Sequence, residues 1–179
     1  MRHLFLPAAG PYVTEAPKSK PFPHPIHWFD KNSEVYYPAA LASHALWRDA
    51  TLPKVDQEFY MFGDSGGYTV VTQPDYSTDP EQVIRWQIAN CTAGVMLDIP
   101  PYRPGSAIQF TGSAAVYWKE SLDRSCDNVR RAMKIYEYHL QAGGLSRPHF
   151  DWWGVVQGEE REQISTPACP LSCTTLPLM

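Results

Sequence analysis

The chain has 179 residues, of which 44% are hydrophobic and 13% aromatic, so it is long enough to bury a core and one globular domain is the default expectation. Its formal net charge of −4 gives no overall attraction for phosphate, so any nucleic-acid contact depends on a local basic patch or on a segment outside this chain. No run approaches the roughly 18 apolar residues of a membrane-spanning helix, which argues against membrane insertion.

Cysteine usage and the N-terminus together predict a cytoplasmic protein. Residues 1–7 lack the long apolar core of a signal peptide, and the four cysteines follow no regular disulfide framework. Cys169 and Cys173 are spaced like half of a metal site, but no paired histidine follows and Pro170 predicts a loop, so an unliganded tail is expected. We therefore expect a reducing compartment and no membrane partner.

Prolines mark the two ends of the chain. The 17 prolines concentrate at residues 7–25 and again after Thr166, where they predict extended connections. Between these ends, short apolar runs alternate with helical patterns, which is typical of βαβ units. We therefore divide the chain into a divergent proline-rich region (1–57), an α/β part (58–163) and an irregular tail (164–179).

The first predicted elements surround a glycine-rich turn. Glu58–Phe62 is a short apolar run that predicts a buried strand, ended by Gly63–Gly67, whose glycines let the backbone approach a ligand closely. A helix is predicted from about Pro80 to about Ala89, with a capping residue just before its first turn. This order of strand, turn and helix begins a βαβ unit.

Two further strands are predicted later in the chain. Gly94–Leu97 is an apolar run that delivers Asp98 at its end, before two prolines stop the strand. Trp152–Val156 predicts another strand, with Gln157 and Gly158 at its C-terminal end.

A long helix is predicted from about Lys119 to Gln141. Arg124, Arg130 and Arg131 lie largely off its apolar side, which favours a solvated face over a phosphate site. The predicted apolar stripe consists of Leu122, Cys126, Val129, Met133, Tyr136 and Leu140.

Polar groups follow three successive predicted strands. Asp64, Asp98 and Gln157 each stand where an apolar run ends. In parallel α/β folds, and in (β/α)8 barrels above all, ligands bind at the carboxyl edge of the strands. Any one of these residues taken alone is better explained as a cap, but three in the same topological place favour a binding edge.

Gly63–Gly67 also has the letters that surround the nucleophilic serine of chymotrypsin-like proteases. In that family the catalytic histidine and aspartate come from a whole β-barrel upstream, whereas only 64 residues precede Ser65. His44 is too close in sequence and lies in a helix-like stretch. A serine-protease function is therefore not expected.

Three short segments, Asp64–Tyr68, Met96–Pro101 and Gly154–Gly158, carry the most specific pattern in the chain. They are similar to the Asp-Ser-Gly-Gly-aromatic motif, the Leu-Asp-x-x-Pro strand end and the Gly-hydrophobic-Val-Gln-Gly strand of the tRNA-guanine transglycosylase superfamily. The helix that begins near Pro80 resembles the family's Ser-Pro-Glu-x-x-Ile-x-x-Gln segment. The resemblance covers residues 58 to 162, in the family's order.

The resemblance implies an α/β fold in the form of an incomplete (β/α)8 TIM-type barrel, with about the first five strands present. It implies a base-exchange transglycosylase that replaces guanine in nucleic acid, tRNA or DNA, by a 7-deazaguanine. Residues 1–57 match poorly, the family's His-Gly-Gly-Leu-like segment is not recognisable, and Glu159 stands where many members have a second glycine. These departures favour a remote branch, such as the paralogues that insert 7-deazaguanines into DNA.

The residues implied to bind the base suit its hydrogen-bonding groups. A carboxylate fits the two donors of guanine, and an amide with backbone N–H groups fits its acceptors. By resemblance, Asp98 binds the donor edge and Tyr68 stacks on the ring, a contact worth ~1–3 kcal/mol. The full implied substrate-binding set is Ser65, Gly66, Gly67, Tyr68, Asp98, Gln157 and Gly158.

Asp64 is implied as the catalytic residue that exchanges a proton with the base. The family also uses an aspartate that attacks the anomeric carbon and a zinc site of three cysteines and one histidine, both from the later half of its barrel. Neither has a match here. The acidic residues after Gln157 are Glu159, Glu160 and Glu162, beside the last predicted strand, and no paired histidine follows Cys169 and Cys173. We therefore expect a truncated or split chain that is inactive alone, with zinc belonging to the missing C-terminal half.

Two other functions stay open. A chain that keeps a base pocket can serve as a non-catalytic partner or base-binding subunit of a transglycosylase, and an unrelated barrel enzyme can use Asp64 and Asp98 for acid–base work. The expected partners are guanine or a 7-deazaguanine, tRNA or DNA, and either further copies of this chain or a complementary C-terminal chain. An incomplete barrel leaves an open strand edge, which favours such association.

Overall fold

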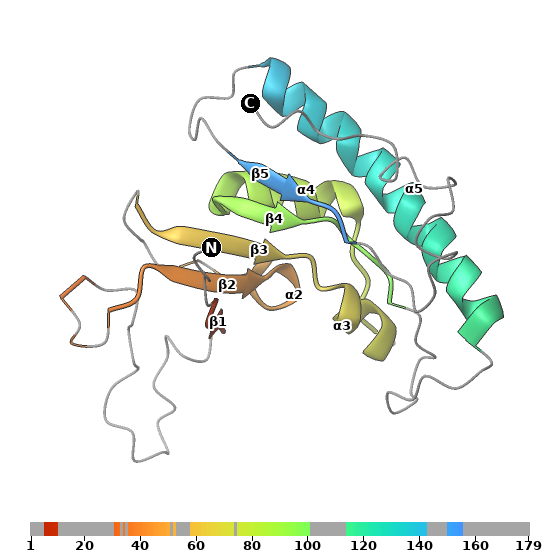
Figure 1. Ribbon diagram of the computed structural model, residues 1–179, viewed down its shortest axis with the longest axis horizontal. Helices are drawn as coiled ribbons and strands as arrows, with labels where there is room; N and C mark the ends of the chain where they lie inside the picture. The colour runs from red at the N-terminus through yellow and green to blue at the C-terminus, as the bar shows by residue number, and fades with distance from the viewer. Residues whose placement is uncertain are drawn as a thin grey trace, which may run out of the picture.

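The computed structural model describes residues 6–10, 31–32, 34, 36–50, 52, 58–73, 75–100, 114–142 and 150–155, with the side chains of the last helix described from residue 119 on. Gln157 and Gly158 lie outside these residues. The elements in chain order are β1 (Ala8–Ala9), β2 (Ala39–Ser43), α2 (His44–Trp47), β3 (Tyr60–Asp64), α3 (Gly67–Thr72), α4 (Pro80–Asn90), β4 (Ala93–Val95), α5 (Ala114–Gln141) and β5 (Asp151–Trp153) (Figure 1).

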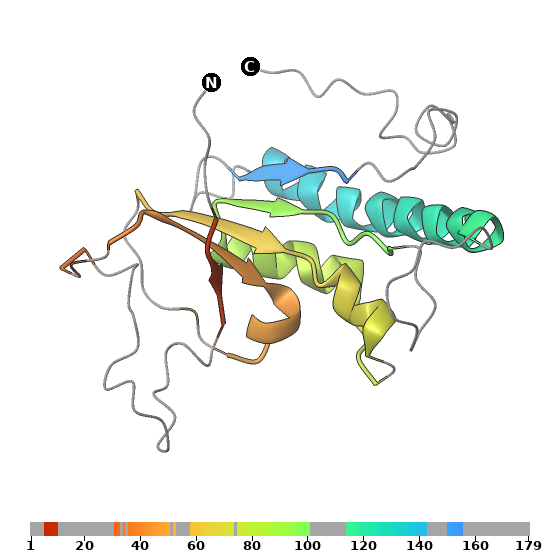
Figure 2. The same ribbon diagram turned by 60° about the horizontal axis from the view of Figure 1, so that its bottom comes forward.

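The strands form one sheet in which every neighbouring pair is parallel. The order in space, β1-β2-β3-β4-β5, is also the order in the chain, so each strand adds to the same edge. α4 packs on β3 and β4, and α5 packs on α4, so both helices cover the same face of the sheet (Figures 1 and 2). The chain is therefore an α/β protein with a singly wound parallel sheet.

The residues before position 58 contribute to this sheet. They supply β1 and β2, and the register places Leu41 of β2 opposite Phe62 of β3. Trp47 of α2 is buried, and its Nε1 donates to the carbonyl oxygen of Ala9 at 2.7 Å. The buried cluster between sheet and helices includes Ala9, Ala40, Ala42, Trp47, Phe59, Met61, Ile84, Cys91, Ala132 and Phe150. In the described part of the chain, no helix is long and apolar enough to cross a membrane.

The predicted helix at Pro80 is confirmed, and so is its cap. α4 begins at Pro80, and the carboxylate of Asp79 accepts a hydrogen bond from the backbone N–H of Glu81 at 3.0 Å. This bond satisfies one of the amides that a helix N-terminus leaves without an intrahelical partner. Arg131 of α5 then reaches Asp79 at 2.8 Å, which ties the start of α4 to the long helix.

The strand boundaries differ from those predicted. β3 ends at Asp64, two residues beyond the predicted end, so the aspartate belongs to the strand and the turn begins at Ser65. β4 ends at Val95, which leaves Met96 and Leu97 as extended backbone leading to Asp98. At β4 the apolar run continues past the strand because Met96 and Leu97 are also buried, whereas β3 continues past its apolar run, so hydrophobicity alone misplaces both ends.

The buried side of α5 differs in part from the predicted stripe. Cys126 and Val129 are buried as predicted, whereas Leu140 is 58% exposed. Ser121 and Ser125, which hydrophobicity would place outside, are buried. The three arginines of α5 are exposed, as predicted.

Gln87 of α4 fills the space that two glycines leave on the helix side of the sheet. Its side chain is fully buried, and Nε2 donates to the carbonyl oxygens of Gly63 at 2.9 Å and of Val95 at 2.8 Å. A methyl group on Gly94 would lie 2.6 Å from Cδ of Gln87, and one on Gly63 would lie 2.9 Å from its Cγ. Both glycines are therefore needed for one amide to bond to two strands.

We expect Gly94→Ala to lower the free energy of unfolding by about 1–3 kcal/mol, because the added methyl displaces the Gln87 amide from its two carbonyl partners. Gly10→Ala is the matched control, since no described atom lies within 4 Å of its added methyl, and its effect should stay within about 0.5 kcal/mol. Urea unfolding followed by tryptophan fluorescence compares them. Equal midpoints for the two variants would contradict this role of Gln87.

Candidate functional site

Asp64 and Asp98 lie at the carboxyl edge of the sheet. Asp64 is the last residue of β3 and is paired in register with Ser43, the last residue of β2. Asp98 follows the end of β4 by three positions. Because the strands are parallel, both aspartates lie at the edge where α2 and α3 begin (Figure 1).

The turn after β3 fixes the Asp64 carboxylate. Oδ2 of Asp64 accepts a hydrogen bond from the backbone N–H of Gly66 at 3.2 Å. Gly66 has φ +80°, a left-handed conformation that favours glycine, and a methyl group there would lie 2.9 Å from Cβ of Ala45 on α2. The turn is thus held between its own aspartate and the neighbouring helix.

Gly67 brings the first motif against the second. A methyl group on Gly67 would overlap the carbonyl oxygen of Asp98 and lie 3.2 Å from its Oδ1. No larger residue fits there without moving the segment that follows β4. Gly67 therefore packs against the backbone of Asp98, so the turn that follows Asp64 leads directly to the segment that carries Asp98.

Three polar side chains of α5 hold the residues on either side of Asp98. Nδ2 of Asn128 donates to the carbonyl oxygen of Leu97 at 3.1 Å. The hydroxyl of Ser125 accepts from the backbone N–H of Ile99 at 2.8 Å, and the hydroxyl of Ser121 donates to the carbonyl oxygen of Ile99. We call Ser121, Ser125 and Asn128 the α5 clamp. It fixes the backbone on both sides of the Asp98 carboxylate.

Ser65 and Tyr68 differ sharply in exposure. Ser65 is fully buried, and its hydroxyl has no hydrogen-bond partner within the described residues. A protease serine would need a histidine bonded there, and none is present in this part of the structure. Tyr68 is 53% exposed at the start of α3, so its ring is accessible at the carboxyl edge.

His44 belongs to this edge, although the sequence did not identify it as a site residue. It is the first residue of α2 and is buried, and its ring packs edge-on against Trp86 with centroids 5.5 Å apart. Nδ1 lies 3.4 Å from both the hydroxyl of Tyr76 and that of Thr78. The sequence signal for His44 is its position directly after a strand, because β2 ends at Ser43 in the same way that β3 ends at Asp64.

Burial lowers the pKa of His44 from its usual 6.5, and the guanidinium of Arg48 lowers it further. The carboxylates of Asp49 and Asp64 act in the opposite direction. Arg48 also lies over the ring of Tyr76, 4.9 Å from the centroid. Burial and Arg48 together favour the neutral imidazole, against the opposing effect of the two carboxylates.

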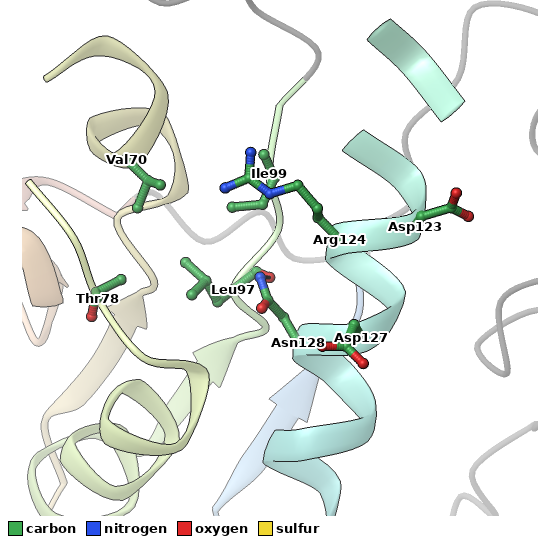
Figure 3. Close-up of a pocket in the computed structure, with 8 residues that line it drawn as sticks. All are labelled: Val70, Thr78, Leu97, Ile99, Asp123, Arg124, Asp127 and Asn128. Atoms are coloured by element: carbon green, nitrogen blue, oxygen red, sulfur yellow. Dashed lines mark hydrogen bonds between the residues drawn. The ribbon is translucent and has the colours of Figure 1, made fainter. Parts of the chain in front are cut away.

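A pocket of about 400 Å³ opens between α3 and α5, next to the segment that carries Asp98 (Figure 3). Its walls come from α3, the residues before α4, the residues after β4, and α5. The lining residues are Val70, Thr78, Leu97, Ile99, Asp123, Arg124, Asp127 and Asn128. Among the described residues, no group of three or more histidines, cysteines, aspartates or glutamates could hold a metal ion.

The lowered pKa of His44 predicts a pH dependence of stability. Above pH 6.5 the imidazole is neutral in both states, so its contribution is fully present. As the pH falls from 6.5 through the folded pKa, the unfolded chain takes up the proton first, and stability falls by at most about 1.4 kcal/mol per pH unit. Free energies of unfolding from about pH 7.5 to about pH 5 should show this slope, and His44→Asn should flatten it. An unchanged slope in the variant would assign the titration to other groups.

The α5 clamp predicts a local effect on the Asp98 segment. Ser125→Ala leaves the buried N–H of Ile99 without its acceptor, which should cost about 1–3 kcal/mol and speed hydrogen exchange of that amide. Glu137→Ala, exposed on the same helix, serves as control and should change neither quantity. NMR hydrogen exchange of the Ile99 amide makes the comparison. If exchange there is as slow in Ser125→Ala as in the control, the clamp does not hold this segment.

No family model, curated protein or solved structure matches this chain. The chemistry of the carboxyl edge is therefore the basis on which a function can be proposed. That edge combines the carboxylates of Asp64 and Asp98, the accessible ring of Tyr68 and the buried imidazole of His44.

Proposed function

We propose that the chain is the base-binding part of a (β/α)8 base-exchange transglycosylase, which replaces guanine in tRNA or DNA by a 7-deazaguanine. The observation that carries the proposal is the contact of Gly67 with Asp98. It joins two motifs that the resemblance to tRNA-guanine transglycosylases assigns to one base pocket. A glycine is required at that contact for steric reasons, which gives a physical cause for the motif.

In this proposal, Asp98 accepts hydrogen bonds from N1 and the exocyclic amine of guanine. A carboxylate with a fixed backbone suits this role, and the α5 clamp supplies that fixation through Leu97 and Ile99. Tyr68 stacks on the ring from the start of α3. The hydroxyl of Ser65 has no hydrogen-bond partner among the described residues, and its contact with a base requires a shift of the turn that buries it.

Asp64 is proposed to exchange a proton with the leaving and the incoming base. Its carboxylate is oriented by the N–H of Gly66, and His44, whose neutral form burial favours, follows the β2 residue that is paired with Asp64. The sequence offers no counterpart of the family's nucleophilic aspartate or of its zinc ligands, and the described residues hold no group that fits zinc. The proposal for this chain therefore concerns base recognition and proton exchange with the base.

The arrangement of the sheet supports a barrel. Leu41 and Phe62 are partners in register, as are Val95 and Trp153, and these side chains lie on the face opposite Gln87 and α4. Trp153 is 55% exposed, and its ring lies 6.3 Å from that of Phe62. An apolar face opposite the helices is what the inside of a (β/α)8 barrel requires, because inner residues pack across the barrel axis.

The test is base binding by Asp98 variants. The parent chain should bind guanine and 7-deazaguanine more tightly than adenine, which lacks the N1–H donor. Asp98→Asn should weaken guanine binding about tenfold or more, because an amide cannot accept from both donors, and the preference over adenine should disappear. Isothermal titration of each variant with the three bases measures both effects.

Asp151→Asn is the matched control, since Asp151 is an exposed aspartate at the first position of β5, at the opposite edge of the sheet. Its affinities should equal those of the parent. Guanine binding by Asp98→Asn that is as tight as in this control would overturn the proposed base pocket.

A further inference from the structure

The pocket between α3 and α5 shares a wall with the proposed base site. Leu97 and Ile99 line it, and they are the residues on either side of Asp98. Asn128 also lines it while its amide holds the carbonyl oxygen of Leu97. A ligand that occupies the pocket therefore lies against the same short segment that presents the Asp98 carboxylate, at the same edge of the sheet.

Arg124 is the one cation of the described residues that line this pocket. In Figure 3 its guanidinium points from α5 toward Ile99 and the side where Val70 stands, whereas Asp123 points away from that side. Arg124 makes no ion pair with a described residue. Arg131, two turns further along the same helix, is neutralised instead by Asp79 at 2.8 Å and Glu81 at 3.6 Å.

The wall that Arg124 faces is apolar. Val70, Leu97 and Ile99 offer no side-chain acceptor, so on that side the guanidinium is open to water or to a ligand with acceptor oxygens. A planar guanidinium matches two oxygens of a phosphate, and an adjacent low-dielectric wall strengthens the attraction. Phosphate oxygens are thus the chemistry that this arrangement fits best.

We infer that Arg124 binds a backbone phosphodiester of the nucleic-acid strand, next to the nucleotide whose base occupies the Asp98 site. This inference rests on the proposed function, because a strand whose base lies at Asp98 carries phosphates within reach of the adjoining pocket. It gives a protein with a net charge of −4 one local contact for a polyanion.

The rim of the pocket sets the sign of a second effect. Asp123 and Asp127 add two carboxylates near Arg124, so a phosphate gains from the guanidinium and loses to the rim. Asp127→Asn should therefore tighten strand binding, whereas Arg124→Ala should weaken it. General unfolding of the pocket would weaken strand binding in both variants. Opposite effects of two substitutions three positions apart on one helix therefore indicate a direct electrostatic contact.

The experiment measures the affinity of the full chain for seven-nucleotide single strands, as RNA and as DNA, across a range of salt concentrations. Each strand is used with a central guanine and with a central abasic site. For both, Arg124→Ala should weaken binding about three- to fivefold and reduce the slope of log affinity against log salt by about 0.7, the value for one phosphate contact on a single strand. Arg130→Ala, an exposed arginine of α5 outside the pocket, is the control and should change neither quantity.

The outcomes separate this inference from the proposed function. If Arg124→Ala reduces the salt slope of binding to the abasic strand, the phosphate contact is supported. If Asp98→Asn leaves the preference for guanine unchanged, base recognition is contradicted, but the phosphate contact is not. Equal effects of Arg124→Ala and Arg130→Ala overturn the phosphate site. Weaker binding by Asp127→Asn also overturns it, because removing a carboxylate near a bound phosphate should only reduce repulsion. If inorganic phosphate displaces the bound strand as effectively as a competing strand does at the same phosphate concentration, the site binds a free anion. That result would overturn the assignment to a strand.

Discussion

One buried amide bridges the two strands that carry the candidate site, in addition to their backbone pairing. Gln87 reaches the sheet only because Gly63 and Gly94 have no side chains, and its Nε2 then bonds to carbonyl groups of β3 and β4. The last pair of the ladder between β3 and β4 is that of those two glycines, so the amide bonds to both strands where their backbone pairing ends. Asp64 follows Gly63 directly, and Asp98 follows Val95 by three positions, so the amide supports the residues that lead to both aspartates.

The two aspartates of the candidate site are positioned by groups that are not proposed to take part in its chemistry. The α5 clamp holds the neighbours of Asp98, the backbone of Gly66 holds Asp64, and α2 fills the space beside Gly66. Each contact comes from a rigid element and acts on a short irregular segment. Loops positioned in this way can present charged groups accurately, because the order of the scaffold is transferred to them by hydrogen bonds.

Local signals in the sequence predicted the elements better than the contacts between them. The cap at Asp79 and the turn after β3 depend on a few adjacent residues, and both could be read directly. Ser125 was missed because a hydrophobic stripe ignores hydroxyl groups, and its burial depends on the partner that Ile99 offers. His44 was missed because its contacts come from a loop more than thirty positions later, and no local pattern indicates that the loop folds back over α2.

The order of the strands bears on how the chain forms during synthesis. Every strand pairs with the strand made just before it, and none must be inserted between two that already exist. A strand that leaves the ribosome therefore finds its one neighbour already present, and the sheet can grow from its N-terminal edge. Parallel sheets usually form slowly, because their pairings join distant parts of the chain. Growth in one direction reduces that difficulty, because each new strand pairs with the strand made just before it.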